Sequence, residues 1–292
     1  MVKLNRIYVI GILFYLSHLV ISSANDIITK YLGQNLGVHE VVFFRFLFAC
    51  ITLLPFMLKD FSSFKTNRIT VHAIRGLLLY GGIGLWVFGL RYVQVSTAVV
   101  INFTIPIFIL LLASMFLKEK IGMHRWVATF FAFLGVIVVN DPTSGGFNAY
   151  GIALLAASVM FASLDVINKF FVVKETMLGM LFYSSVFTTL FSAYPASQEW
   201  VTPTSKDMIL FFVLGGGANL LLFFLLKSFE KIDVSSIAPL RYFELIISSI
   251  FAYLVFGDIP DSSTIFGAMI IIPSTLFVVM YDARKKRRSA KK

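Results

Sequence analysis

The stretches SSANDIITK (residues 22–30) and FASLDVINK (residues 161–169) are the parts of the sequence from which the fold follows. Each contains an aspartate and a lysine four residues apart, Asp26 with Lys30 and Asp165 with Lys169, and the second pair lies 139 residues after the first. Both pairs lie in long apolar runs, where an ionised group costs about 2.5–3.5 kcal/mol at the centre of a membrane helix. Charged residues at such positions are unfavourable unless they have a structural or functional role. The recurrence of the same pair indicates two related halves.

The same offset relates other parts of the chain. It carries residues 95–97 (Val-Ser-Thr) onto 234–236 (Val-Ser-Ser), residues 117–119 (Leu-Lys-Glu) onto 256–258 (Phe-Gly-Asp), and Gly76 onto Gly215. Small residues such as these glycines let membrane helices approach closely. Duplicated membrane halves that carry charge inside the bilayer are typical of secondary transporters.

Composition also indicates a membrane protein. Of the 292 residues, 58% are hydrophobic and 14% are charged, against roughly 25% charged residues in a soluble domain, and the mean hydropathy is +0.87. The formal net charge of +10 does not predict a nucleic-acid partner, because seven of the 25 basic residues lie within residues 284–292. A short basic segment beside a membrane helix is typical of a solvated cytoplasmic tail.

Ten apolar segments have the length that a bilayer span requires, roughly 17–25 residues. They cover residues 7–31, 40–58, 71–91, 95–117, 124–140, 149–170, 177–196, 207–229, 234–256 and 263–281. The sequence therefore predicts an all-α membrane protein with ten transmembrane helices in two five-helix repeats. The predicted repeats are residues 1–141 and 142–282, and a basic tail follows at 283–292.

The basic residues predict the orientation of the spans, because cytoplasmic loops carry an excess of Lys and Arg. With the N-terminus inside, 18 basic residues fall in the inner segments and only Arg91 and Lys206 in the outer ones. Both termini are then cytoplasmic. Because five helices per half is an odd number, the second half enters from the opposite side, which predicts inverted repeats and alternating access.

Two charged residues in the ninth span are candidates for substrate binding. Arg241 and Glu244 are three residues apart and share a helix face, and Arg45 lies inside the second span. Such groups face a protein interior or a hydrated cavity rather than lipid. Guanidinium and carboxylate together suit a zwitterion, whereas a structural Arg–Glu clamp without a ligand is the alternative.

The two repeated pairs are candidates for gates. In the predicted topology Asp26 lies near the outer surface and Asp165 near the inner one, so each could close one side of a cavity. Alternatively, Lys30 and Lys169 form intrahelical ion pairs with them or extend to the lipid headgroups.

Uncharged side chains complete the predicted substrate path. We expect Trp86, Asn102, Asn168 and Tyr183 to line it. Trp86 lies in the middle of a span rather than at the membrane interface where Trp is usual, and its ring could stack on an aromatic group or face a cation. Simple packing of these residues is the alternative.

The sequence predicts a carrier rather than an enzyme. It contains no Cys/His metal spacing, no H-E-x-x-H and no Walker A motif. We therefore expect no catalytic residue, cofactor or metal, and transport driven by a gradient or by exchange.

Ten spans in two repeats, with the fourth span ending Phe-Leu-Lys-Glu (116–119), resemble the EamA type of the drug/metabolite transporter superfamily over nearly the whole chain. Several strings are similar to the S-adenosylmethionine uptake transporters of obligate intracellular bacteria: residues 22–26, 43–46, 75–79, 165–169, 182–184 and 241–245. The second repeat departs from the superfamily pattern, because it ends Phe-Gly-Asp (256–258) rather than Gly-Glu.

The resemblance implies import of S-adenosylmethionine across the bacterial inner membrane, in exchange for S-adenosylhomocysteine. An exporter of amino acids or related small metabolites would share the fold and is the second hypothesis. A membrane-embedded enzyme or assembly factor is a third, which the internal symmetry and the missing catalytic motifs disfavour.

Overall fold

The computed structural model describes residues 6–92, 101–139 and 149–256, together with 266, 269–270, 272–274, 276–278 and 280–282. Within these residues the chain forms helices, turns and loops, and no strand. The predicted boundary between the repeats, at 141/142, and the basic tail at 283–292 lie outside the described residues.

The helices follow the apolar segments closely. They are α1 Arg6–Gly33, α2 Val38–Lys59, α3 Ile69–Tyr92, α5 Ile105–Phe116, α6 Met123–Val139, α7 Ala149–Phe171, α8 Met177–Gln198, α9 Ser205–Lys231, α10 Val234–Ile237 and α11 Phe243–Phe256, with short 3₁₀ helices η1 Phe61–Phe64 and η3 Ala238–Tyr242. Six of them, α1, α2, α3, α7, α8 and α9, are long and apolar enough to cross a bilayer. The all-helical membrane fold is thereby confirmed, whereas the total of ten spans remains a prediction.

The predicted span over 234–256 is not one regular helix. The structure divides it into α10, η3 and α11, with Pro239 near the start of η3. Proline has no backbone N–H and its ring clashes with the preceding turn, so a regular helix does not continue through it. A similar break separates the helical residues 101–102 from α5, in which Pro106 occupies the first turn.

Charged residues terminate and connect the helices. The carboxylate of Glu119, in the loop after α5, accepts hydrogen bonds from the backbone N–H groups of Val234 and Ser235, both at 3.3 Å. Those N–H groups begin α10 and have no partner inside the helix, so the carboxylate satisfies them. The Leu-Lys-Glu ending of the fourth predicted span thus ties α5 to the start of the broken ninth span.

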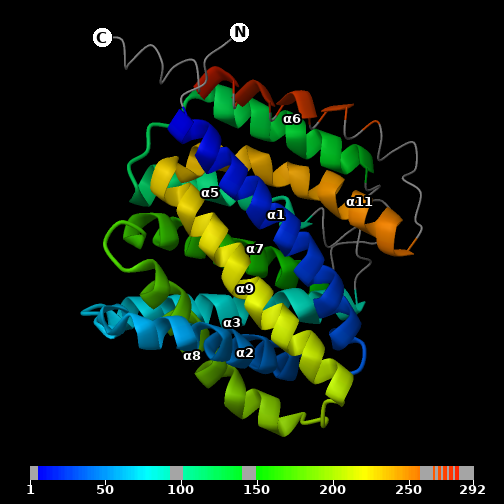
Figure 1. Ribbon diagram of the computed structural model, residues 1–292. Coiled ribbons are helices and arrows are strands. Elements are labelled where there is room, and N and C mark those ends of the chain that lie inside the picture. Colours follow the sequence, from blue (N-terminus) through cyan, green and yellow to red (C-terminus); the bar gives the residue numbers. More distant parts are fainter. Residues whose placement is uncertain are drawn as a thin grey trace.

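The helices pack in pairs whose members come from opposite halves of the chain. In Figure 1, α1 and α9 run diagonally across the front, and α2, α3 and α8 lie together in the lower half, where α9 crosses in front of α3. The contacting pairs include α1 with α9, α3 with α7, α2 with α8, α2 with α9, α3 with α8, α5 with α7 and α1 with α11. A shift of 139 residues carries α1 onto α7, α2 onto α8, α3 onto α9 and α5 onto α11. Each contacting pair therefore corresponds either to another pair in this set or to itself.

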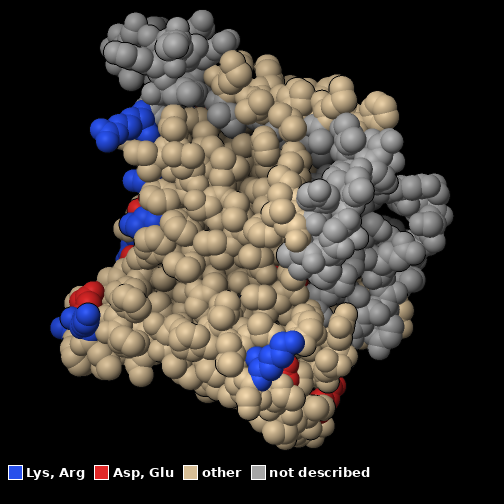
Figure 2. Space-filling view, turned by 45° about the vertical axis from the view of Figure 1, so that its right-hand side comes forward, with Lys and Arg blue, Asp and Glu red and all other residues tan. Residues whose placement is uncertain are grey.

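The molecular surface fits a lipid environment. Figure 2 shows a broad uncharged face, with charged side chains only near its edges. Many large apolar side chains are exposed on the helices, among them Leu13, Phe130, Leu190 and Ile209. Contiguous exposed apolar surface of this extent is unfavourable in water and favourable against acyl chains.

Two glycines allow the closest helix crossings. A methyl group at Gly76 of α3 would overlap Cβ of Phe187 and lie 3.1 Å from the backbone N of Thr188 on α8. A methyl group at Gly215 of α9 would lie 2.6 Å from the backbone N of Ala49 on α2. The two glycines are 139 residues apart, and so are Thr188 and Ala49. Both halves therefore use a glycine to bring one backbone against another.

We expect Gly76→Ala to lower thermal stability, because the added methyl group meets a backbone that cannot move aside. Overpacking of this kind costs about 1–3 kcal/mol. Gly84→Ala on the same helix is the matched control, since no atom lies within 4 Å of the added carbon. The unfolding midpoint in detergent measures both. Equal midpoints for the two variants would contradict the close crossing.

Candidate functional site

A cavity of about 140 Å³ lies between α1, α2, α3, α7, α9 and the segment η3–α11, and we call it the central cavity. Five charged side chains line it: Asp26, Arg45, Asp165, Arg241 and Glu244. Apolar and aromatic side chains such as Phe46, Phe161 and Leu222 form much of the remaining wall. A few polar groups converging in an apolar pocket are typical of a ligand site.

Arg241 lies between two carboxylates in this cavity. Its Nη1 is 3.3 Å from Oδ2 of Asp165, and its Nε is 3.9 Å from Oε2 of Glu244. The break at Pro239 places Arg241 in η3 and Glu244 in the first turn of α11, so both project from a bend rather than from a continuous helix. The hydroxyl of Ser22 lies beside the Glu244 carboxylate. Arg241 therefore joins α7 to α11.

Asp165 does not pair with Lys169, although their spacing allows an intrahelical ion pair. The Lys169 ammonium instead donates hydrogen bonds to the carbonyls of Phe229 and Ile232, at 2.5 and 2.8 Å. These carbonyls lie at the C-terminal end of α9, where a cation is favoured by the helix dipole. Lys169 thus does not line the central cavity, and the side chain of Lys30 lies outside the described residues.

Arg45 and Asp26 line the cavity without a direct protein partner. Arg45 is 9% exposed, and its buried Nε makes no hydrogen bond with the residues that the structure describes. The Asp26 side chain is exposed, and no hydrogen bond or ion pair joins it to another described residue. Two opposite charges are therefore presented to the cavity rather than used to join helices.

Trp86 and Asn102 also lie in the cavity wall. Oδ1 of Asn102 is buried without a hydrogen-bond partner among the described residues, so the amide is available to another group. Seven of the residues expected from the sequence are thereby brought together: Asp26, Arg45, Trp86, Asn102, Asp165, Arg241 and Glu244.

Two polar residues in the lining were not expected from the sequence, His18 and Ser22. His18 is 5% exposed, and its Nδ1 lies 2.9 Å from the carbonyl oxygen of Leu221. A signal was present, because His18, Ser22 and Asp26 follow one another at intervals of four and so form a polar stripe along one face of α1.

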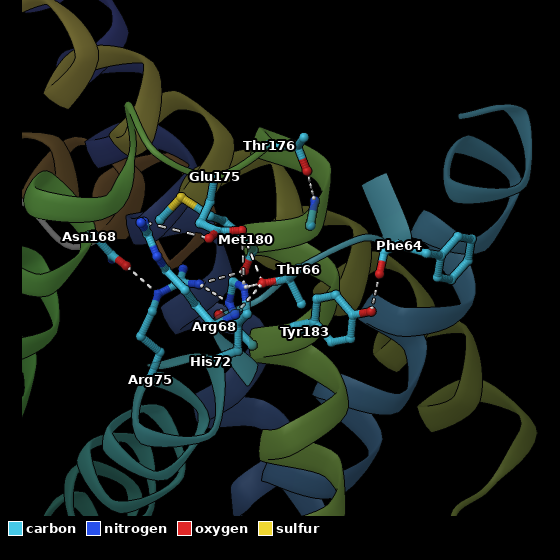
Figure 3. Close-up of polar contacts among 12 residues, drawn as sticks. Phe64, Thr66, Arg68, His72, Arg75, Asn168, Glu175, Thr176, Met180 and Tyr183 are labelled. Carbon is cyan, nitrogen blue, oxygen red and sulfur yellow. Dashed lines mark hydrogen bonds and ion pairs between the residues drawn. The ribbon is translucent and has the colours of Figure 1, made fainter. Parts of the chain in front are cut away.

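Asn168 and Tyr183, expected on the substrate path, belong to a separate buried cluster (Figure 3). Oδ1 of Asn168 accepts a hydrogen bond of 2.7 Å from Nε of Arg75, which is fully buried. The Tyr183 ring stacks on His72 at 5.1 Å, and its hydroxyl donates to the carbonyl of Phe64 at 2.7 Å. Asn168 and Tyr183 therefore do not line the central cavity, and their part in substrate binding stays a prediction.

The same cluster joins α3 to the segment between α7 and α8. Nη1 of Arg75 donates to the carbonyl of Met180 at 3.0 Å and lies 3.1 Å from Nδ1 of His72. Glu175 accepts a hydrogen bond from Thr66 at 3.1 Å and lies 3.7 Å from Nε2 of His72. Most of these polar groups bond to one another, which is how buried polar groups are stabilised in a protein interior. Nη2 of Arg75 and Nδ2 of Asn168 are buried without a hydrogen-bond partner among the described residues.

A larger cavity, about 350 Å³, lies between α5 and α7, and apolar side chains such as Leu112, Val166 and Phe170 dominate its lining. It contains no charged side chain. Because recognition of a polar solute requires placed polar groups, the central cavity is the better candidate for the functional site.

Comparisons with known proteins agree with the membrane fold. The EamA-like transporter family matches residues 9–141 and again residues 149–280. The S-adenosylmethionine uptake transporter of Rickettsia conorii is 48% identical over 284 residues, which covers 97% of this chain and 97% of that protein. The transporter of the same name from Rickettsia felis is 47% identical with the same coverage. One solved crystal structure, 16% identical, matches 94% of the chain with a TM-score of 0.79 and supports the fold alone.

We expect Asn168→Ala to destabilise the protein, because it leaves a buried guanidinium N–H without its acceptor. A lost partner of this kind costs about 1–3 kcal/mol. The unfolding midpoint of the purified protein is the measurement. Asn35→Ala, in an exposed turn, removes the same group and should leave the midpoint unchanged. If both variants have the same unfolding midpoint as the wild type, the Arg75 cluster does not stabilise the fold.

Proposed function

The chain belongs to the EamA-like transporter family, and from this we propose that it imports S-adenosylmethionine across the bacterial inner membrane. The observation that carries the proposal is the 48% identity, over nearly the full length of both chains, to a protein named as an S-adenosylmethionine uptake transporter. The membrane location follows from the family and from the six long apolar helices.

The central cavity has the chemistry that this substrate requires. S-adenosylmethionine carries an amino-acid zwitterion, a sulfonium and an adenine ring. A guanidinium, from Arg45 or Arg241, suits the carboxylate, and the Glu244 carboxylate suits the ammonium. The Trp86 ring offers a stacking surface to adenine, and the Asn102 amide offers hydrogen bonds. A cavity of 140 Å³ is smaller than the roughly 300–1,000 Å³ of common ligand sites, so it must widen to hold the whole molecule.

Inverted repeats would give the transporter its two access states. The exchange of helix contacts by a 139-residue shift supports a two-fold relation between the halves, and so does the matching of one family to each half. Phe103 and Tyr242, which are 139 residues apart, also touch: their ring centroids are 5.4 Å apart, and the Tyr242 hydroxyl donates to the Phe103 carbonyl at 3.3 Å. Equivalent residues meet in this way at a two-fold axis.

The two repeated aspartates are proposed gates on this scheme. Asp165 is paired with Arg241, whereas Asp26 is exposed in the cavity. The two groups are therefore in different states, which is what alternating access requires of gates on opposite sides. Both termini are cytoplasmic in this proposal, and S-adenosylhomocysteine leaves in exchange. An exporter of amino acids or related metabolites is the alternative with the same fold.

Cells that express the chain should accumulate labelled S-adenosylmethionine, and Arg241→Ala or Glu244→Ala should abolish the uptake at normal membrane levels. Arg241→Ala leaves Asp165 and Glu244 without their ion-pair partner, whereas Glu244→Ala leaves Arg241 paired with Asp165 but removes the carboxylate proposed for the substrate ammonium. Lys227→Ala and Glu230→Ala are the controls, because that pair has the same i, i+3 spacing but lies partly exposed at the end of α9.

Absence of accumulation in wild-type cells with the protein in the membrane would contradict import. Efflux of preloaded amino acids without any uptake would favour the exporter. If the Arg241 and Glu244 variants fail to reach the membrane, the two residues form a structural clamp instead.

The predicted orientation can be checked by cysteine labelling in a Cys50→Ala background. Lys206→Cys, at the exposed start of α9, should react with a membrane-impermeant maleimide in intact cells. Lys65→Cys, in the exposed segment between α2 and α3, should react only after the membrane is opened. The reverse pattern would place both termini outside.

A further inference from the structure

The central cavity contains more negative than positive charge. Asp26, Asp165 and Glu244 contribute three carboxylates, whereas Arg45 and Arg241 contribute two guanidinium groups. His18 is buried and bonded through Nδ1 to the Leu221 carbonyl. A neutral imidazole with its proton on Nδ1 can donate that bond, and His18 is counted here as uncharged. Among the described residues, the lining of the cavity therefore has a net charge of −1.

The pairing within the cavity shows where the excess charge lies. Arg241 forms ion pairs with Asp165 and Glu244, at 3.3 and 3.9 Å. Arg45 and Asp26 remain, and within the described part of the chain neither has an ion-pair partner within 4.0 Å. Arg45 is 9% exposed with an unbonded Nε, which is a costly state for a guanidinium in a protein interior. Both groups border the cavity, so a ligand can neutralise them.

Resting on the function proposed above, we infer that Asp26 is the counter-ion of the substrate's sulfonium and determines the selectivity of the site. The ligand carboxylate then binds Arg45, and Asp26 faces the permanent positive charge on sulfur. S-adenosylmethionine has one carboxylate, one ammonium and one sulfonium, so its net charge is +1 and the loaded cavity is neutral.

The inference separates substrates by charge rather than by shape. S-adenosylhomocysteine lacks the methyl group on sulfur and with it the positive charge. It therefore leaves Asp26 without a counter-ion in the loaded cavity, which weakens its binding without preventing the exchange proposed above. An uncompensated charge there costs far more than a missing methyl contact. Sinefungin places an ammonium where the sulfonium lies and keeps the net charge of +1. It should therefore be recognised, although it contains no sulfur.

The test is displacement of labelled S-adenosylmethionine from the full chain in lipid vesicles, by sinefungin and by S-adenosylhomocysteine. For the wild type, sinefungin should displace the label at a concentration at least about tenfold lower, equivalent to about 1.4 kcal/mol. Asp26→Asn should reduce this ratio to nearly one, whereas Asp26→Glu should preserve it.

Two comparison variants isolate the effect. Asp165→Asn removes a cavity carboxylate that is already used by Arg241, so it should weaken both competitors alike and keep their ratio. Glu230→Gln, at the end of α9 and outside the cavity lining, should change neither.

The possible failures are distinguishable. If the wild type does not bind S-adenosylmethionine, the proposed function and this inference are both wrong. If it binds the substrate but the Asp26→Asn variant keeps its preference for sinefungin, only the role of Asp26 is wrong. If sinefungin and S-adenosylhomocysteine displace the label from the wild type equally well, the role of Asp26 is also wrong. That result requires no variant, so it holds even if Asp26→Asn does not fold.

Discussion

The arrangement of Arg241 between Asp165 and Glu244 is the interaction on which the rest of this structure depends. A charge surrounded by hydrocarbon must be paired, hydrated or lost. Here one guanidinium links a carboxylate on α7 to another on α11. The link holds together elements that are 76 residues apart in the chain and leaves their charges facing a cavity. The ion pairs offset the cost of burying these three charges. Because all three groups also border the cavity, they remain available to a ligand.

The pairing requires the helices to cross at defined places. Gly76 and Gly215 set two of those crossings by backbone contact, and the break at Pro239 turns the ninth span so that Arg241 reaches α7. The Arg75 cluster secures a different region, where α3 meets the segment between α7 and α8. The two polar clusters thus connect different sets of helices, and apolar contacts between the helices provide the remaining packing.

We connect ligand binding with the charged side chains that helix packing leaves without an ion-pair partner. In the Arg75 cluster the charged and polar side chains contact one another, so the cluster acts within the protein. In the central cavity, Arg45 and Asp26 border the open volume, and neither has an ion-pair partner within 4.0 Å among the described residues. The contrast explains why buried charge alone does not identify a binding site. A buried charge indicates a binding site where it borders a cavity and has no ion-pair partner among its neighbours.

The sequence by itself determined the class of fold, the helix segments and the relation between the halves, because hydropathy and a fixed offset are properties of the chain. A shift of 139 residues carries the ends of α2 onto those of α8. It also determined that Arg241 and Glu244 are neighbours, since i, i+3 spacing is local geometry. Only the tertiary structure decided that Asp165 pairs with Arg241 rather than Lys169, and that Asn168 and Tyr183 lie outside the cavity. The physical reason is that a long side chain takes its partner from whichever helix packs opposite, and spacing along one helix carries no information about that neighbour.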